Sequence, residues 1–179
     1  AATISRISRD LDHEVKLYHS RPLTDHYRYL FFDGVVLKTK GAAKVQKKIL
    51  LCAFGITVDG KQEMIDFHVA ASESAACWES FLNDLYQRGL LGSRCELIAT
   101  DGGTGLHAAL EIVYPKILLQ RCWAHKTRNV LDKVKKKDQP AVKKALNRIS
   151  HGGNRREAAQ AYWRFSSRWR KPYPRAVAC

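Results

Sequence analysis

Three strand-length stretches near the start of the chain decide the fold: YLFFDGVV (residues 29–36), KKILLCAFGITV (47–58) and QEMIDFHVA (62–70). The first two are largely apolar, and the third partly alternates polar and apolar side chains. Asp59 and Gly60, between the second and third stretches, are typical of a tight turn. Together these stretches predict three antiparallel strands that follow one another directly.

Helices and short strands alternate beyond these three strands. The patterns predict a helix capped by Ser72 or Ser74, a strand at 96–99, a helix that ends before Pro115, and a strand at 117–122. Amphipathic helical patterns also cover residues 1–20, 127–136, 141–149 and 155–169. The order βββαβαβ followed by helices predicts an α/β fold with an RNase H-like mixed sheet.

Two acidic residues stand at positions in this sheet that favour a metal site. Asp33 interrupts the apolar first strand, where the adjacent Gly34 leaves room for another group. Asp101 follows the strand at 96–99, and in an RNase H-like sheet these two strands are neighbours. Paired carboxylates suit Mg²⁺, which stabilises the attacking and leaving oxygens of an in-line phosphoryl displacement. Taken singly, Asp33 can be explained by a strand bend, and Asp101 by a turn or helix N-cap.

The net charge of +14 lies entirely in the last third of the chain. Residues 1–119 hold 14 basic and 14 acidic residues, whereas residues 120–179 hold 17 basic and 3 acidic residues. So one-sided a distribution favours a polyanionic partner such as DNA or RNA, because neutralised phosphates release condensed counterions. The alternative is a solvated helical surface without such a partner.

A short motif closes the last predicted strand: Cys122 and His125, in QRCWAH, have CxxH spacing. A structural zinc site needs four ligands, and no second pair follows in the sequence at ligand spacing. The alternative is a packing cysteine with a histidine near the acidic pair. Arg121, Lys126 and Arg128 flank the motif, and we expect them to grip phosphates close to that pair.

Composition argues against several classes of protein. The 179 residues are 45% hydrophobic, which argues against disorder, and no apolar run reaches the roughly 18 residues of a membrane helix. The five cysteines are scattered and odd in number, and the first ten residues lack the apolar core of a signal peptide. We therefore expect reduced thiols, no membrane partner and a cytoplasmic location.

The chain resembles the Mutator-type transposases, including the bacterial insertion-sequence group, in three segments: YLFFDGVVLK (29–38), LIATDGGTGLHAAL (97–110) and LLQRCWAHKTRN (118–129). The resemblance covers about residues 3–177. It implies an RNase H-like fold with a helical insertion and three metal-binding acids, of which Asp33 and Asp101 match the first two. Cys122 and His125 match the CxxH of the family.

The resemblance also implies an activity: cleavage of DNA at the terminal inverted repeats of an element with Mg²⁺ or Mn²⁺, followed by strand transfer into target DNA. Because two element ends must be held together, we expect a homo-oligomer at full length, associated with the bacterial nucleoid. Along the chain we expect the tail of a helix-turn-helix segment (1–24), a partial catalytic core (25–125) and a basic helical insertion (126–179).

The third acid of the family, a glutamate beyond the helical insertion, has no match in this sequence. In the family it lies past the segment that resembles WRKPYPRAV (169–177), and the sequence stops at Cys179. We therefore expect a fragment of a longer transposase that is inactive by itself. Glu157, in NRRE (154–157), is better explained as part of a capping box with Asn154 at the start of a helix.

Two other functions stay open at this point. A non-catalytic nucleic-acid-binding module would use the basic helices alone, although a buried carboxylate such as Asp33 would repel the phosphate it must hold. An RNase H-like nuclease would use Glu157 or another acid and would cut nucleic acid as the chain stands.

Overall fold

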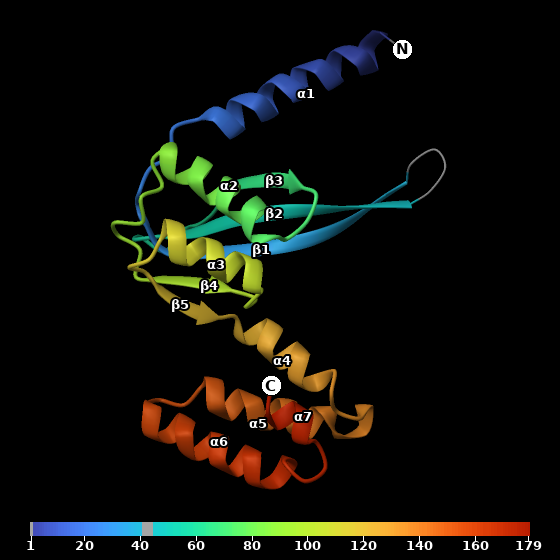
Figure 1. Ribbon diagram of the computed structural model, residues 1–179, viewed down its shortest axis with the longest axis vertical. Coiled ribbons are helices and arrows are strands. Elements are labelled where there is room, and N and C mark those ends of the chain that lie inside the picture. The colour runs from blue at the N-terminus through green and yellow to red at the C-terminus, as the bar shows by residue number, and fades with distance from the viewer. Residues whose placement is uncertain (1, 41–44) are drawn as a thin grey trace. The chain divides into compact units, whose positions relative to one another are not determined.

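The structure is a computed structural model that describes residues 2–40 and 45–179 (Figure 1). The chain divides into two compact units, Ala1–Gln120 and Arg121–Cys179, which we call the sheet unit and the helical unit. No helix in the described ranges is long and apolar enough to cross a membrane.

The sheet unit combines one long helix, a mixed sheet and two shorter helices. Its elements are α1 (Ala2–Ser20), β1 (Tyr27–Lys40), β2 (Val45–Thr57), β3 (Gln62–Ala70), α2 (Ala75–Gln87), β4 (Leu97–Thr100), α3 (Thr104–Val113) and β5 (Leu118–Arg121). The strand order is β3-β2-β1-β4-β5, with β1 antiparallel to β2, β2 antiparallel to β3, and β4 parallel to β1. This arrangement confirms the predicted α/β fold with an RNase H-like sheet.

The core of the sheet unit lies on one face of the sheet, beneath α2 and α3 (Figure 1). Leu30 and Phe32 of β1 point into this core and are 0% and 1% exposed. Their neighbours Phe31 and Val35 point to the opposite face, because strand side chains alternate, and are 37% and 40% exposed. The apolar stretch that predicts this strand is therefore buried on one face, beneath α2 and α3, and exposed at Phe31 and Val35 on the other.

Helix α2 begins and packs as its sequence predicts. The hydroxyl of Ser74 accepts a hydrogen bond from the backbone N–H of Cys77, which satisfies one of the donors left open at a helix start. The buried face of α2 comprises Trp78, Phe81, Leu82 and Leu85. Helix α2 thereby fixes the loop between β3 and α2 next to the sheet.

A buried carboxylate anchors the end of α1 to the sheet unit. Asp66 of β3 is 1% exposed and accepts hydrogen bonds from His19 at 2.6 Å and from the backbone N–H of Phe67 at 2.7 Å. It also pairs with Arg88, whose guanidinium reaches the backbone carbonyl of His19.

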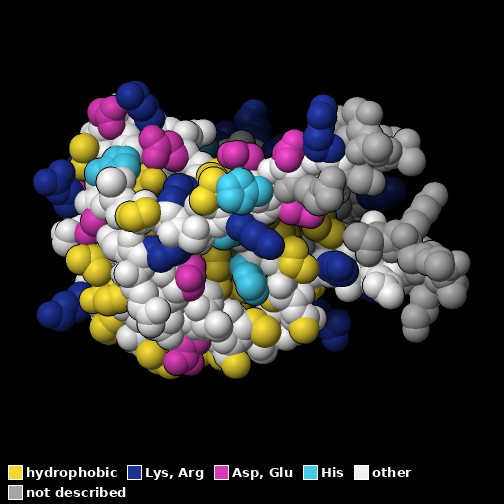
Figure 2. All heavy atoms as spheres, turned by 90° about the horizontal axis from the view of Figure 1, so that it is seen from above, with side chains coloured by type: hydrophobic (Ala, Val, Ile, Leu, Met, Phe, Trp, Pro, Cys, Tyr) yellow, Lys and Arg dark blue, Asp and Glu magenta, His cyan; other side chains and the backbone are white. Residues whose placement is uncertain are grey.

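On the face seen from above in Figure 2, charged side chains of both signs are interspersed.

The helical unit consists of short helices around a smaller core. Its elements are α4 (Trp123–Leu131), a 3₁₀ turn η1 (Lys136–Asp138), α5 (Gln139–Ser150), α6 (Arg155–Trp169) and α7 (Pro174–Val177). The buried residues are Val130, Val134, Val142, Leu146, Phe165, Trp169 and Ala176. The helices predicted at 141–149 and 155–169 are confirmed as α5 and α6.

The first helix of this unit differs from its prediction at 127–136. It starts at Trp123, directly after Cys122, and ends at Leu131. The side-chain amide of Gln139 donates to the backbone carbonyls of Leu131 and Val134, at 3.0 and 3.2 Å. These bonds satisfy carbonyl groups at the end of α4, so the chain turns before the lysine-rich segment instead of continuing through it.

Candidate functional site

Neighbouring strands bring Asp33 and Asp101 to matching positions. In the parallel ladder between β1 and β4, Phe32 lies opposite Thr100. The residue that follows Phe32 is Asp33, and the residue that follows Thr100 is Asp101. The structure therefore brings the two predicted acids together at the carboxyl end of β4.

The turn after β4 orients the Asp101 carboxylate. Its Oδ1 accepts a hydrogen bond of 2.8 Å from the backbone N–H of Gly103, and the hydroxyl of Thr100 accepts one of 3.2 Å from Gly102. Gly102 has a φ of 87°, in the left-handed region that favours glycine. This tight turn leads from Asp101 through Gly102 to Gly103, the N-cap residue of α3.

Asp33 is half-buried in the middle of β1 and lies opposite Cys52 of β2. Cys52 is 2% exposed, and burial together with the negative charge of Asp33 raises the pKa of its thiol. Cys52 is therefore a neutral packing residue beside the acidic site, with no chemistry of its own at neutral pH.

Glu73, in the loop between β3 and α2, is a third carboxylate at this place, and the sequence analysis missed it. Burial raises its pKa, and so do the negative charges of Asp101 and Asp33. A Cβ atom added to Gly34 would lie 2.5 Å from the Oε1 atom of Glu73. The space predicted beside Gly34 is thus occupied by Glu73. No local sequence motif indicates this contact, because it depends on the path of the chain between β1 and the loop after β3.

The carboxylates do not by themselves form a complete metal site. Among the residues that the structure describes, no three His, Cys, Asp or Glu side chains are grouped so that they could hold a metal ion. Asp33 and Asp101 contribute oxygen donors of the kind that Mg²⁺ and Mn²⁺ prefer, and Glu73 adds negative charge nearby. The arrangement can attract a divalent cation and supply two of its ligands.

The CxxH motif and the basic residues around it belong to the end of β5 and to α4. Cys122 is the N-cap residue of α4, and His125 lies in its first turn with an Nδ1 atom that is buried and lacks a hydrogen-bond partner among the described residues. The ammonium group of Lys126 donates to the backbone carbonyl of Cys179. Arg121 and Arg128 are both exposed. These residues are grouped in the helical unit, whereas the acids lie in the sheet unit.

Glu157 has the structural role predicted for it. The Asn154 side chain accepts a 3.0 Å hydrogen bond from the backbone N–H of Glu157, and the Glu157 carboxylate accepts one of 3.0 Å from Gly153. These bonds form a variant of the capping box at the start of α6, in which Glu157 reaches the N–H of the residue before the N-cap Asn154, and they confirm the predicted interpretation.

Comparison with curated proteins finds relatives among bacterial transposases. The transposase for insertion sequence element IS905 of Lactococcus lactis subsp. lactis is 32% identical over 98% of this chain and 44% of its own length. The transposase for IS1201 of Lactobacillus helveticus is 29% identical over 98% of this chain and 47% of its own length. That for ISRM5 of Rhizobium meliloti is 33% identical over 99% of this chain and 44% of its own length. This chain therefore spans about half the length of these relatives.

Comparison with solved structures adds a weaker similarity. A cryo-EM structure of the simian T-cell lymphotropic virus intasome in complex with a PP2A regulatory subunit aligns with 79% of this chain and 48% of its own, at 15% identity. Its TM-score of 0.33 is too low to carry an argument about fold or function. The sequence comparison is far stronger, since a family model described as "Transposase, Mutator family" matches residues 1–179, and the chain belongs to that family.

Proposed function

We propose that this chain is part of a DNA transposase in which Asp33 and Asp101 bind a divalent metal ion. The reaction is cleavage of DNA at the terminal inverted repeats of an element, followed by strand transfer into target DNA. One observation carries the proposal: the pairing of Phe32 with Thr100 sets the two acids side by side on parallel neighbouring strands. The family match and the printed names of the relatives support it.

The donor set of the two acids fits Mg²⁺ or Mn²⁺. Both ions prefer oxygen ligands and keep several waters when one or two carboxylates bind them. Asp33 and Asp101 would hold the ion, and the bond from Gly103 keeps the Asp101 carboxylate in a fixed orientation. A bound ion supplies Lewis-acid stabilisation of the attacking and leaving oxygens of a phosphodiester displacement.

The three carboxylates at this edge of the sheet also determine when DNA can approach it. Burial raises the pKa of Glu73, and the negative charges of Asp101 and Asp33 raise it further, so the three carboxylates repel one another. They repel phosphate for the same reason. DNA is therefore admitted to the acidic site only together with a cation that neutralises part of this charge.

The helical unit supplies the positive charge that a DNA partner needs. Within it, we propose that Arg121, Lys126 and Arg128 grip phosphates near the scissile end, and Cys122 and His125 lie beside them at the start of α4. Lys126 must then exchange its present bond to the Cys179 carbonyl for a phosphate oxygen. In the whole protein, the joining of two element ends calls for at least a dimer at the bacterial nucleoid.

Metal binding by the unaltered chain is the first test. Titration with Mn²⁺, followed by the loss of the free-ion signal in electron paramagnetic resonance, should reveal a site that Asp33→Asn and Asp101→Asn each weaken about tenfold or more. Asp59→Asn is the matched control, since Asp59 is an exposed carboxylate in the turn after β2. If both site variants bind Mn²⁺ like the unaltered chain, the two-carboxylate site has to be given up.

DNA cleavage tests the catalytic part of the proposal. With supercoiled plasmid and Mg²⁺ or Mn²⁺, we expect no cleavage by this chain, because the described residues supply two ligands rather than three. Cleavage that disappears in both Asn variants would show that the chain holds a complete catalytic set and that a third acid elsewhere is not needed. Cleavage that instead depends on Glu157 would favour the nuclease alternative.

The non-catalytic binding module predicts a different result. Without metal, either Asn variant should tighten DNA binding if the acids face phosphates, because a source of repulsion is removed. A module whose acids are vestigial should bind DNA equally well with or without them. DNA affinity that is unchanged in both variants, together with unchanged Mn²⁺ binding, would favour that module.

A further inference from the structure

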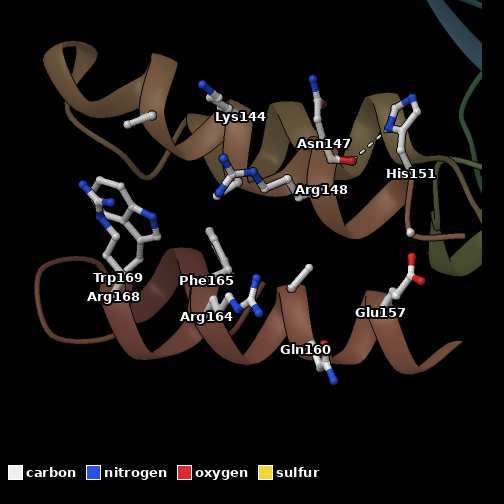
Figure 3. Close-up of a pocket in the computed structure, with 14 residues that line it drawn as sticks. Lys144, Asn147, Arg148, His151, Glu157, Gln160, Arg164, Phe165, Arg168 and Trp169 are labelled. Atoms are coloured by element: carbon white, nitrogen blue, oxygen red, sulfur yellow. Dashed lines mark hydrogen bonds between the residues drawn. The ribbon is translucent and has the colours of Figure 1, made fainter. Parts of the chain in front are cut away.

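A groove runs between α5 and α6 of the helical unit, and its lining includes none of the residues assigned above to DNA or metal. It encloses about 950 Å³ and lies between two helices that run side by side (Figure 3). Its lining includes four cationic side chains, two from each helix: Lys144 and Arg148 of α5, and Arg164 and Arg168 of α6.

The positive charge of this groove is only partly balanced by its own lining, which holds four cationic side chains and one acidic one. None of its four cations takes part in the ion pairs found among the described residues. Glu157 is the acidic residue in the lining, and its carboxylate is already engaged by the N–H of Gly153 and by the Asn154 side chain. Four like charges held around one space repel one another, and this repulsion is relieved when an anion enters.

A buried donor at one end of the groove also calls for an acceptor. Trp169 lines the groove and is 7% exposed, yet its indole Nε1 is buried without a hydrogen-bond partner in the described part of the chain. Leaving such a donor unsatisfied costs about 1 to 3 kcal/mol. The Arg168 guanidinium lies 5.1 Å from the centre of the Trp169 ring, so an anion drawn to Arg168 comes close to the indole.

The size and spacing of the groove indicate the class of anion. Its volume is at the upper end of the range for small-molecule pockets, far more than one phosphate needs. Lys144 and Arg148 are one turn apart, as are Arg164 and Arg168, so each pair is separated by about 6 Å along its helix axis. Cations spread along two helices match several successive phosphates better than a single ion.

We propose that this groove binds the phosphate backbone of a DNA strand. The phosphate oxygens accept hydrogen bonds from the four cationic side chains and, at one end, from the indole N–H of Trp169. The inference rests on the proposed function in taking DNA as the partner, but it concerns residues that the acidic site does not use. It gives α5 and α6 a defined binding surface instead of a general positive charge.

A charge-matched pair of double variants tests the groove in the whole chain. Arg148→Gln with Arg164→Gln removes two groove cations, whereas Lys143→Gln with Arg155→Gln removes two exposed cations from the same helices outside the lining. In fluorescence anisotropy with a labelled DNA duplex at fixed salt, we expect the groove variant to lose about tenfold or more in affinity. The slope of its DNA affinity against salt concentration should fall by the equivalent of about two phosphate contacts. The DNA affinity of the control should change less than about threefold. Equal losses in both variants would overturn the proposal.

The NMR signal of the Trp169 indole N–H provides a second test, because it reports on a hydrogen bond and not only on the charge of the groove. Trp169→Phe keeps an aromatic ring in the core and removes the indole N–H donor. The indole peak that is missing from the ¹H–¹⁵N spectrum of this variant is therefore the Trp169 peak in the spectrum of the unaltered chain. We expect this signal to shift when the DNA duplex is added and the affinity of the variant to fall about threefold or more. A static indole signal would contradict the proposal. An indole signal that shifts with inorganic pyrophosphate but not with DNA would mean that the groove binds a small anion and not DNA.

The tests separate a failure of the groove from a failure of the proposed function. A chain without salt-sensitive DNA binding would overturn the groove and the DNA partner together. DNA binding that ignores the groove variants, with Mn²⁺ binding that depends on Asp33 and Asp101, would overturn the groove alone. Circular dichroism of every variant confirms that the helical content is kept.

Discussion

The sheet unit and the helical unit divide the charged residues of the chain in opposite ways. Up to residue 120 the chain holds 14 basic and 14 acidic side chains, and beyond it 17 basic and 3 acidic ones. Within the sheet unit, Arg28 pairs with Glu96, and Arg88 pairs with Asp66 and Asp84. A unit without net charge and with internal ion pairs can hold an acidic site, whereas a unit with a large excess of positive charge is suited to a polyanion.

The two units also differ in how their cores are built. Trp78 and Phe32 lie in a core that a sheet and two helices form together, whereas Phe165 lies in a smaller core of short helices. Because each core draws on residues of its own unit, we expect damage to one core to leave the other folded.

The largest predicted effect comes from emptying one core at a time. Trp78→Ala and Phe165→Ala should each lower the free energy of unfolding of their own unit by about 3 to 5 kcal/mol. Hydrogen exchange followed by mass spectrometry locates the loss. Trp163→Ala is the control, since Trp163 is 64% exposed, and should change stability by about 0.5 kcal/mol or less. If exchange rises equally in both units, they fold as one cooperative structure and the comparison fails.

The ion pairs of the sheet unit should differ in strength according to their burial. Arg88 contacts Asp66, which is 2% exposed at its side chain, and Asp84, which is 56% exposed. Asp66→Ala leaves Arg88 and His19 without their buried acceptor and should cost about 3 kcal/mol or more. Asp84→Ala removes an exposed carboxylate one helical turn from Arg88 and should cost about 0.5 kcal/mol. Urea unfolding of both variants measures the difference, and similar losses would mean that burial does not set the strength of these pairs.

The sequence carried enough information for the sheet and for its two acids, since both depend on local patterns. Strand-length apolar stretches gave β1, β2 and β3, and the residues after β1 and β4 in an RNase H-like order gave the positions of Asp33 and Asp101. Ser74 and Asn154 were recognisable as helix caps because capping depends on neighbours three residues away.

Other features depend on contacts between distant residues and left no local signal. No local pattern marks Glu73, and its closeness to Gly34 follows from how β3, α2 and β1 pack. Helix α4 begins at Trp123, four residues before the predicted start, and no side-chain cap at Cys122 marks this boundary in the sequence. The groove between α5 and α6 required knowing which cations face each other across two helices.

Equivalent helix caps allow the two units to be compared at a smaller scale. Ser74→Ala at α2 and Asn154→Ala at α6 each remove a side-chain acceptor for a backbone N–H and should cost about 1 kcal/mol. Glu157→Gln should cost less, because glutamine can also complete a capping box. Thermal unfolding checks the three values. A loss of Mn²⁺ binding in Glu157→Gln would contradict the assignment of the metal-binding acids to the sheet unit.

The smallest predicted effect concerns the repulsion between Glu73 and the two acids. Its pKa is raised above 4.5, by burial first and then by the charges of Asp101 and Asp33, so the folded chain holds this proton more tightly than the unfolded chain. Stability should therefore fall as the pH rises from about 4.5 through the raised pKa, and Glu73→Gln should remove that fall. Because Glu73 is exposed, water screens the repulsion, and the gain at pH 7 should be about 0.5 kcal/mol or less.

Glu79→Gln is the matched control for this variant, since Glu79 belongs to α2 and lies only partly exposed. In thermal unfolding, Glu73→Gln should be more stable than Glu79→Gln at pH 7, and the two variants should not differ at pH 4. Addition of Mg²⁺ at pH 7 should then shrink the advantage of Glu73→Gln, because a cation held by Asp33 and Asp101 offsets the charge that Glu73 meets. A gain that persists at pH 4, or that Mg²⁺ leaves unchanged, would show that Glu73 acts through packing and that its charge is not coupled to the acidic pair.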